Sequence, residues 1–306
     1  MRVCVVGCGA VGSLFAAGLA QLDDVEVWAY DLAADHVRAM NERGLRISGA
    51  GELVGRLEAT TEAAELPPCE FGIVATKSMH TGAALEATAH AFAEGSVCSV
   101  QNGVGNEETI AEHATRVIRG TTFPAGHLVE PGHVHWDVAG ETTIGPFEES
   151  PAPMDAVERL AEACTRGGLP TAAVEDARGP QWRKVIFNAA TNPVGALTGL
   201  THGQVCEDEG LRRLVSALVD EGKAVAGAQG IELDADPEEL IDYAARPDVA
   251  YDHKASMLQD AEARRETEID YLNGGIVRFG REQGIPTPLN EAVVALVKGL
   301  EASWRR

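Results

Sequence analysis

The sequence has few basic residues and no long apolar run. Its 25 lysine and arginine residues are outnumbered by 47 acidic residues, so the formal net charge is −22. Nucleic acids and anionic membrane surfaces are bound through lysine and arginine, which argues against both as partners. No segment approaches the roughly 20 consecutive apolar residues of a membrane-spanning helix, and the N-terminus has the pattern of a strand and a turn rather than a signal peptide. These absences predict a globular cytoplasmic protein.

Paired cysteines and metal-ligand motifs are also missing. The six cysteines form no C-x-x-C pair, and Cys4 and Cys8 straddle a strand and its turn, which is a poor geometry for a metal. Free thiols and a reducing compartment are therefore expected. The nine histidines include no H-E-x-x-H motif, and His133 and His135 alternate on one face of a strand. We expect no metal site.

The most informative feature that is present is a glycine motif at the N-terminus. An apolar run over residues 3–6 leads into Gly7, Gly9 and Gly12 in the spacing G-x-G-x-x-G, and a helical pattern follows over residues 13–22. The first glycine permits a sharp turn, the second lets the backbone approach a pyrophosphate, and the third lets the helix pack closely on its strand. The phosphates would lie on the N–H groups at the positive end of that helix. The sequence therefore predicts a dinucleotide-binding segment, which comprises Gly7, Cys8, Gly9, Ala10, Val11 and Gly12.

Strand-like and helix-like segments alternate through the first half of the chain, which is typical of a mostly parallel sheet covered by helices. Residues 123–147 change to short alternating runs with many glycines and prolines, and are expected as antiparallel additions to the sheet edge. A helix over 154–167 and a strand over 170–175 close this half. The other expected strands cover residues 25–31, 71–76, 96–101 and 117–122, and the other expected helices cover 33–43, 81–93 and 107–113.

From Gln181 onward the apolar residues recur at spacings of three and four, which indicates helices throughout. Gly230 and Gly284 are suitable helix ends. We therefore expect residues 1–178 to form a dinucleotide-binding domain and residues 179–306 a helical substrate-binding and catalytic domain. The predicted fold class is α/β, a doubly wound sheet followed by an all-helical domain. A cleft between these domains is where a substrate would meet the cofactor.

Asp31 bears on the choice of dinucleotide. It ends the second expected strand, nineteen residues after Gly12, where an acidic side chain usually binds the ribose hydroxyls of the adenosine. Two like charges about 4 Å apart repel by roughly 4 kcal/mol at an effective dielectric constant of 20, which disfavours a 2′-phosphate there. The next basic residue, Arg38, lies two helical turns further on. The sequence therefore favours NAD(H); the alternative is that Asp31 only caps the following helix.

Lys184, Asn188 and Asn192 form a polar stripe on an otherwise apolar helix. Their spacing of four residues places them on one face. Buried without partners, each would cost a few kcal/mol, so they need ligands or neighbours. Pro193 follows at once and is expected to kink the helix. The alternative is that the asparagines pair with a neighbouring helix while Lys184 extends to water.

Further polar residues stand in places where a ligand would bind. Ser256 and Glu268 are twelve residues apart, near one face of a helical stretch. Lys77 and Asn102 follow the third and fourth expected strands, at the carboxyl ends where open α/β sheets bind ligands. The alternatives are that Glu268 is a solvated helix residue and that the segment 101–103 is a plain Asn-Gly turn.

Together these motifs resemble the ketopantoate reductase family, the 2-dehydropantoate 2-reductases. They are spread in order over nearly the whole chain, so the resemblance is specific for the superfamily and less specific for the substrate. The matching segments are GCGAVG at 7–12, TKS at 76–78, QNG at 101–103, K-x-x-x-N-x-x-x-N-P at 184–193, SMLQD at 256–260 and TEIDYLNG at 267–274.

The resemblance implies a Rossmann-type domain joined to a helical domain, and the reduction of 2-dehydropantoate to pantoate by a nicotinamide cofactor. It places Lys184 and Glu268 in the catalytic positions. A lysine ammonium stabilises the charge that develops on the keto oxygen and donates its proton, and Glu268 can keep that lysine charged. The candidate substrate-binding residues are Asn102, Asn188, Asn192 and Ser256, and the candidate cofactor-binding residues beyond residues 7–12 are Asp31, Lys77 and Asn102.

Two residues depart from the usual pattern of the family. Members that act on ketopantoate usually carry a basic residue where Asp31 stands and use NADPH, so NADP(H) stays an alternative to NAD(H). His202-Gly203 stands where many members have Asn-Gly, which makes the His202 imidazole a candidate substrate-binding group.

These departures favour a second hypothesis beside 2-dehydropantoate reduction, namely an NAD-dependent D-2-hydroxyacid dehydrogenase acting on a branched or aromatic 2-keto acid. A third hypothesis is a non-catalytic dinucleotide-binding module, which would have no need for Lys184 and Glu268. The sequence leaves the oligomeric state open, with a homodimer as one alternative.

Overall fold

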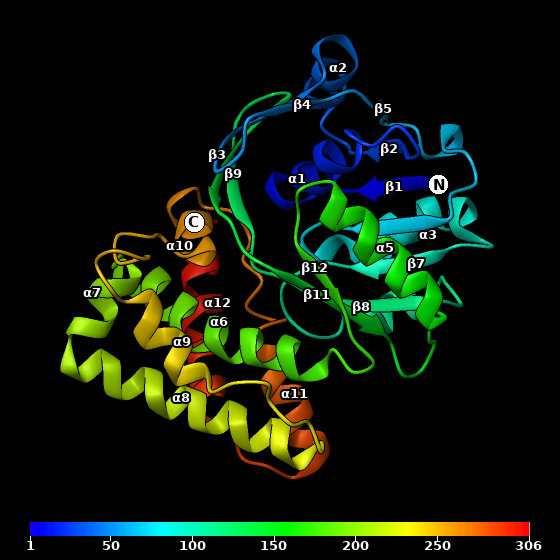
Figure 1. Cartoon of the computed structure of the whole chain (residues 1–306). Helices are drawn as coiled ribbons and strands as arrows, with labels where there is room; N and C mark the ends of the chain where they lie inside the picture. The colour runs from blue at the N-terminus through cyan, green and yellow to red at the C-terminus, as the bar shows by residue number, and fades with distance from the viewer. Residues whose placement is uncertain (306) are drawn as a thin grey trace. The chain divides into compact units, whose positions relative to one another are not determined.

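The computed structural model of the protein describes residues 1–305, which fall into two compact units (Figure 1). The first unit comprises residues 1–101 and 106–177, and the second comprises residues 102–105 and those from 178 onward. None of the helices in residues 1–305 has both the length and the apolar character that a membrane crossing requires. The cysteines are free thiols, and all but Cys206 are buried.

The first unit is built on an eight-stranded sheet in the order β12-β11-β8-β7-β6-β1-β2-β5. All neighbouring strands pair in parallel except β8 and β11, which are antiparallel. The predicted doubly wound α/β sheet is thereby confirmed. The strands are β1 (Arg2–Val6), β2 (Glu26–Tyr30), β5 (Glu58–Thr60), β6 (Phe71–Val74), β7 (Ser96–Ser99), β8 (Val117–Thr122), β11 (Thr142–Pro146) and β12 (Thr171–Ala173).

Side chains of β1 alternate between two cores, one on each face of the sheet. Val5 packs in a cluster with Phe15 of α1 and Leu160 of α5, whereas Val6 packs in a cluster with Leu85 of α3. Burial on both faces explains why this strand is an uninterrupted apolar run. The helices of the unit are α1 (Ala10–Leu19), α2 (Ala34–Arg43), α3 (Thr81–Thr88), α4 (Asn106–Ala111) and α5 (Met154–Arg166).

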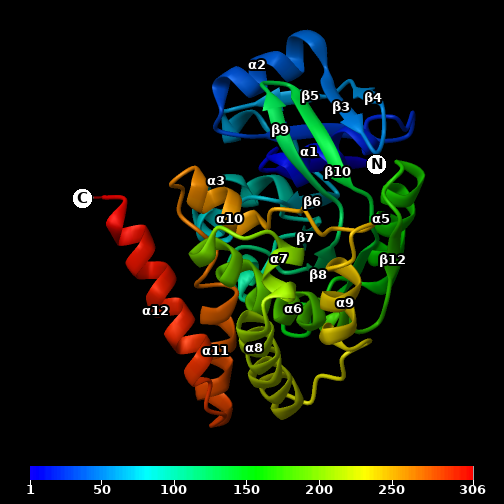
Figure 2. The same ribbon diagram turned by 90° about the vertical axis from the view of Figure 1, so that its left-hand side faces the viewer.

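Residues 123–147 differ from the prediction. Only β11 joins the large sheet, whereas β9 (Ala125–Glu130) and β10 (His133–Val138) form a second sheet with β3 (Leu45–Gly49) and β4 (Leu53–Gly55), in the order β4-β3-β10-β9 (Figure 2). The cause is burial, since Ile47 of β3 and Val134 of β10 share the core that contains α1. The hydroxyl of Ser48 lies 2.8 Å from Nε2 of His133 and 3.2 Å from Nδ1 of His135, so these two imidazoles do face the same side.

The second unit is helical, as predicted, and is organised around α6. This helix packs against α7, α8, α9, α10 and α12, and α8, α11 and α12 run side by side (Figure 2). Asp208 caps α8 and Asp236 caps α9, while Gly230 and Gly284 adopt positive φ just beyond α8 and α11, where helix ends were predicted. The helices are α6 (Arg178–Thr198), α7 (His202–Glu207), α8 (Glu209–Ala228), α9 (Pro237–Ala244), α10 (Ser256–Glu262), α11 (Asn273–Gln283) and α12 (Pro288–Ser303).

Candidate active site

The three glycines of the N-terminal motif have different steric surroundings. Gly7 has a φ of +89°, and a Cβ there would lie 2.8 Å from the backbone nitrogen of Thr76. A Cβ on Gly12 would lie 2.0 Å from the carbonyl oxygen of Gly7, so the close contact of α1 with the turn requires a glycine. A Cβ on Gly9 would meet no atom within 4 Å. Folding therefore explains Gly7 and Gly12, whereas Gly9 leaves open space beside the turn.

That open space lies at the start of α1. Gly9 is the N-cap of this ten-residue helix, it provides no side-chain cap, and the first turn of the helix contains no acidic residue. The N–H groups of the first turn and the positive end of the helix are thus left for an anionic ligand. These features fit the pyrophosphate of a dinucleotide.

Gly9 and Gly12 form a matched pair for testing this interpretation. We expect Gly12→Ala to reduce the free energy of unfolding by about 1–3 kcal/mol, because its Cβ overlaps a backbone oxygen, and to lower Tm by several degrees. Gly9→Ala should leave Tm unchanged and weaken binding of NADH. Thermal denaturation and NADH fluorescence titration measure the two effects. Equal losses of Tm in both variants would contradict the assignment of open space to Gly9.

Asp31 links the glycine turn to the start of α2. Its Oδ2 accepts a hydrogen bond from the backbone N–H of Cys8, and its Oδ1 accepts one from Ala33, both over 2.8 Å. Ala33 is the N-cap of α2, so the carboxylate stabilises the start of that helix as well as the turn. A carboxylate oxygen accepts more than one hydrogen bond, and both oxygens therefore retain capacity for a ribose hydroxyl.

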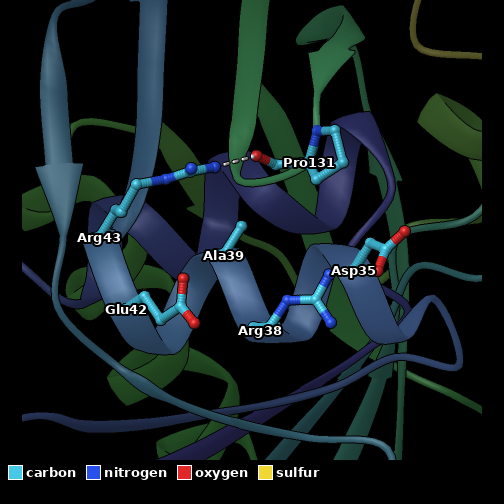
Figure 3. A pocket seen from close by; sticks show the side chains of 6 residues that line it. All are labelled: Asp35, Arg38, Ala39, Glu42, Arg43 and Pro131. Atoms are coloured by element: carbon cyan, nitrogen blue, oxygen red, sulfur yellow. Dashed lines mark hydrogen bonds and ion pairs between the residues drawn. The ribbon is translucent and has the colours of Figure 1, made fainter.

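The two arginines of α2 form hydrogen bonds with residues other than Asp31. Arg38 forms an ion pair with Asp35, and the guanidinium of Arg43 donates to the carbonyl of Pro131 over 3.1 Å. These side chains line a surface pocket between α2 and the β9–β10 turn (Figure 3). The pocket presents charges of both signs, and its two arginines are engaged by Asp35 and Pro131 rather than gathered for a 2′-phosphate.

Gln101 connects the carboxyl ends of two parallel strands. Its Nε2 donates to the carbonyl of Thr76 over 3.0 Å and to the hydroxyl of Thr81 over 2.7 Å. Lys77, which follows Thr76, lies at this edge of the sheet. Gln101 was expected only as part of the QNG motif; the signal for this link is a polar amide that directly follows an apolar strand.

Asn102, which follows Gln101, belongs to the helical unit together with the rest of residues 102–105. Its Oδ1 accepts a hydrogen bond of 2.8 Å from the Nζ of Lys184 on α6. The N–H of Val104 donates to the carbonyl of Tyr271 over 3.0 Å, and Gly103 has a φ of +87°. The Asn-Gly turn is therefore more than a connection between elements, because it brings an amide oxygen to the candidate lysine.

Lys184 is partly buried, and two opposing effects act on the pKa of its ammonium. Burial lowers the pKa of its ammonium to about 8, and the negative charge of Glu268 opposes that shift. Asn188 and Asn192 follow at successive turns of α6 and are buried, as is Glu268. The structure thus brings the ammonium into contact with Asn102 and within the electrostatic influence of Glu268, so Lys184 is not simply extended into water.

The remaining candidates have different environments. Ser256 is exposed at the first residue of α10, a helix that packs against α6. His202 is buried, its Nε2 lies 3.1 Å from the carbonyl of Ile241, and its ring packs against Phe187. Both contacts of the imidazole are internal to the helical unit. Among residues 1–305 no group of histidine, cysteine and acidic residues has the arrangement of a metal site.

Comparison with known proteins identifies the family. Residues 3–149 match the family described as "Ketopantoate reductase PanE/ApbA", and residues 176–301 match its C-terminal region, "Ketopantoate reductase PanE/ApbA C terminal". The chain belongs to the ketopantoate reductase family. This family is one of dinucleotide-binding reductases, so the predictions of the family, the enzyme class and dinucleotide binding are confirmed.

Ketopantoate reductases from archaea and bacteria are similar to this chain over their whole length. A 2-dehydropantoate 2-reductase of Pyrococcus abyssi is 34% identical, with 99% of this chain and 98% of the relative covered, and that of Pyrococcus horikoshii is 35% identical with the same coverage. Among solved structures, a ketopantoate reductase family member from Ralstonia eutropha JMP134 has a TM-score of 0.89 at 30% identity, covering both chains fully. A D-mandelate dehydrogenase solved with NADH and anilino(oxo)acetate has a TM-score of 0.88 at 26% identity, covering 99% of each chain.

Proposed function

We propose that this chain reduces a 2-keto acid to the 2-hydroxy acid, with 2-dehydropantoate as the preferred substrate, pantoate as the product and NADH as the reductant. The observation that carries the proposal is the Lys184 ammonium, which donates to Asn102 and whose pKa burial lowers to about 8 against the opposing charge of Glu268. In this proposal residues 1–178 form the dinucleotide-binding domain and residues 179–306 form the catalytic domain. Asn102 lies within residues 1–178 of the sequence but packs with the catalytic domain.

The cofactor side of the proposal rests on the glycine turn. The uncapped start of α1 and the open space at Gly9 would hold the pyrophosphate, and Lys77 would lie at the same edge of the sheet. Asp31 would bind the adenosine ribose. When bound, the nicotinamide supplies the hydride that adds to C2 of the keto acid.

The residues of the helical domain would complete the reaction. As the C2–O double bond opens, negative charge develops on the oxygen, and the Lys184 ammonium stabilises it and transfers one proton to it. Neutral Lys184 then regains a proton from water. Glu268 favours the charged lysine, while Asn102, Asn188, Asn192 and Ser256 would orient the carboxylate and hydroxyl groups of the substrate.

A panel of 2-keto acids assayed with NADH and with NADPH tests the proposed function. We expect 2-dehydropantoate to have the highest kcat/KM, by about tenfold or more over phenylglyoxylate and 2-ketoisovalerate, since each well-placed hydrogen bond to a substrate hydroxyl contributes on the order of tenfold or more. A panel in which no 2-keto acid is reduced would overturn it.

One observation favours a second candidate, a D-2-hydroxyacid dehydrogenase. The similar structure of a D-mandelate dehydrogenase contains NADH and anilino(oxo)acetate. Asp31 of this chain also favours NAD(H) over NADP(H). A higher kcat/KM for phenylglyoxylate than for 2-dehydropantoate would select this candidate.

The titration of Lys184 gives a pH dependence. We expect kcat for reduction to be constant at low pH and to fall as pH rises through about 8, because only the protonated lysine donates a proton and its pKa is about 8. Glu268→Gln should move this fall to lower pH, since the charge of Glu268 raises the pKa of Lys184. The measurement is kcat from pH 5 to 10.

Glu262→Gln is the matched control for this profile. Glu262 is an exposed glutamate of α10 that pairs with Lys254. Its replacement should leave the pH profile unchanged. A Glu268→Gln profile that superimposes on that of the wild type would remove Glu268 from the surroundings of Lys184.

A further inference from the structure

Pro193 leaves one carbonyl of α6 without its helical partner. Proline has no N–H, so the carbonyl of Ala189, four residues earlier, receives no bond from position 193. Asn273, the first residue of α11, supplies the missing donor, because its Nδ2 lies 2.8 Å from the oxygen of Ala189. The helix continues through Pro193 to Thr198, and this buried contact gives the carbonyl of Ala189 a hydrogen-bond donor at that point.

The amide of Asn273 is held on its other side by a buried network. Its Nδ2 also donates to Oδ1 of Asn290 on α12 over 2.9 Å, and Nδ2 of Asn290 donates to Oε2 of Glu221 on α8 over 2.7 Å. The Oδ1 of Asn273 is buried and has no hydrogen-bond partner within residues 1–305. An unpaired buried acceptor is destabilising. Both N–H groups of the Asn273 amide are therefore hydrogen-bonded, although its oxygen is not.

Asn273 ends the turn that carries Glu268. The carbonyl of Glu268 accepts hydrogen bonds from the N–H groups of Tyr271 and Leu272, and α11 begins at the next residue. The bond from Asn273 to Ala189 ties this turn directly to α6, about one helical turn beyond Lys184. The turn that places Glu268 is thus joined to the helix that places Lys184.

The same turn also holds the segment that bears Asn102. The carbonyl of Tyr271 accepts the N–H of Val104, and Asn102 accepts the Nζ of Lys184. Together with the contact between Asn273 and α6, these bonds form a closed circuit that begins and ends on α6. The circuit includes Lys184 and its amide partner Asn102, and it passes through the turn that carries Glu268.

We propose that Asn273 is a positioning residue for the reaction, which fixes Glu268 and Asn102 about the Lys184 amine by replacing the helical hydrogen bond that Pro193 removes. The inference rests on the proposed function. It assigns Asn273 no contact with substrate or cofactor, because its donors are used by Ala189 and Asn290.

Asn273→Ala is the first test. We expect kcat to fall by about tenfold to a hundredfold, because small displacements of catalytic groups have effects of this size, while KM changes by less than about threefold. The alkaline fall in kcat should move below pH 8, since a displaced Glu268 raises the pKa of Lys184 less.

Pro193→Ala provides a rescue that is specific to this hydrogen bond. It gives position 193 an N–H that can bond to the carbonyl of Ala189, so the donor of Asn273 becomes redundant. The double variant Asn273→Ala/Pro193→Ala should recover most of the wild-type kcat and the original pH profile. A double variant that regains Tm without regaining kcat would overturn the proposal.

Asn290→Ala is the matched control, because it removes the other partner of the same amide and leaves the contact with α6. It should lower Tm while kcat and the pH profile stay close to those of the wild type. If Asn273→Ala likewise lowers only Tm, its role is structural and the proposal is wrong.

A measurement without turnover separates this inference from the proposed function. The chain has only five lysines, so Lys184 can be titrated in the ¹³C NMR spectrum of protein labelled at lysine Cε and assigned by its loss in Lys184→Ala. If the wild type reduces no 2-keto acid, the proposed function fails. The positioning role is still supported if the pKa of Lys184 is lower in Asn273→Ala than in the wild type and the double variant restores the wild-type value. An unchanged pKa in Asn273→Ala overturns it.

Discussion

Lys184→Ala is expected to lower kcat for 2-keto acid reduction by about 10³-fold, within the range of about 10² to 10⁴ that general acid catalysis provides. The variant loses both the proton that neutralises the developing alkoxide and the positive charge that stabilises it. The affinity for NADH, measured by fluorescence titration, should change little, because the glycine turn and Asp31 are untouched.

Lys223→Ala is the control for this experiment. Lys223 also lies in the helical unit, where its Nζ forms an ion pair with Asp236 over 2.6 Å. Its replacement should leave kcat unchanged. If Lys184→Ala binds NADH normally and loses less than about tenfold in kcat, Lys184 is not the proton donor.

The second large effect concerns the choice of cofactor. We expect the wild type to prefer NADH over NADPH by about 10² to 10³-fold in kcat/KM, because a repulsion of roughly 4 kcal/mol between Asp31 and a 2′-phosphate corresponds to about three decades. Asp31→Asn should remove most of this preference. The asparagine has a single side-chain oxygen, so the glycine turn can keep the hydrogen bond from Cys8 while the start of α2 loses the one from Ala33.

Asp35→Asn is the matched control, four residues further along the chain. Asp35 is exposed and pairs with Arg38, so its replacement should leave the NADH preference within about twofold of the wild type, as for a surface charge. A wild-type enzyme that prefers NADPH tenfold or more would contradict the assignment of Asp31.

Much of the first unit was predictable because its signals are local. The buried run before Gly7 indicates a strand buried on both faces, and the glycine spacing indicates a strand, a turn and a helix within twelve residues. The small sheet was missed because β3 pairs with β10, which lies far along the chain: Ser48 and His133 are 85 residues apart in sequence and 2.8 Å apart in space. Short strands that need a distant partner leave little periodicity to detect.

The candidate site shows the same division. A helix with 3.6 residues per turn places Lys184, Asn188 and Asn192 on one face whatever surrounds it. The pKa of Lys184, in contrast, depends on burial and on Glu268, which lies on another segment. The sequence pattern likewise contains no sign that Asn273 would supply a donor to the carbonyl that Pro193 leaves unbonded.

The class of fold was predictable from the alternation of segments along the chain, and the dinucleotide turn and the lysine-bearing face of α6 were predictable from residues within one or two turns of one another. The contacts of Asn102 with Lys184 and of Asn273 with Ala189 depend instead on tertiary packing. These contacts join residues 82 and 84 positions apart. They form because burial forces polar groups to find partners, and which partners come within reach depends on the packing of the whole helical unit.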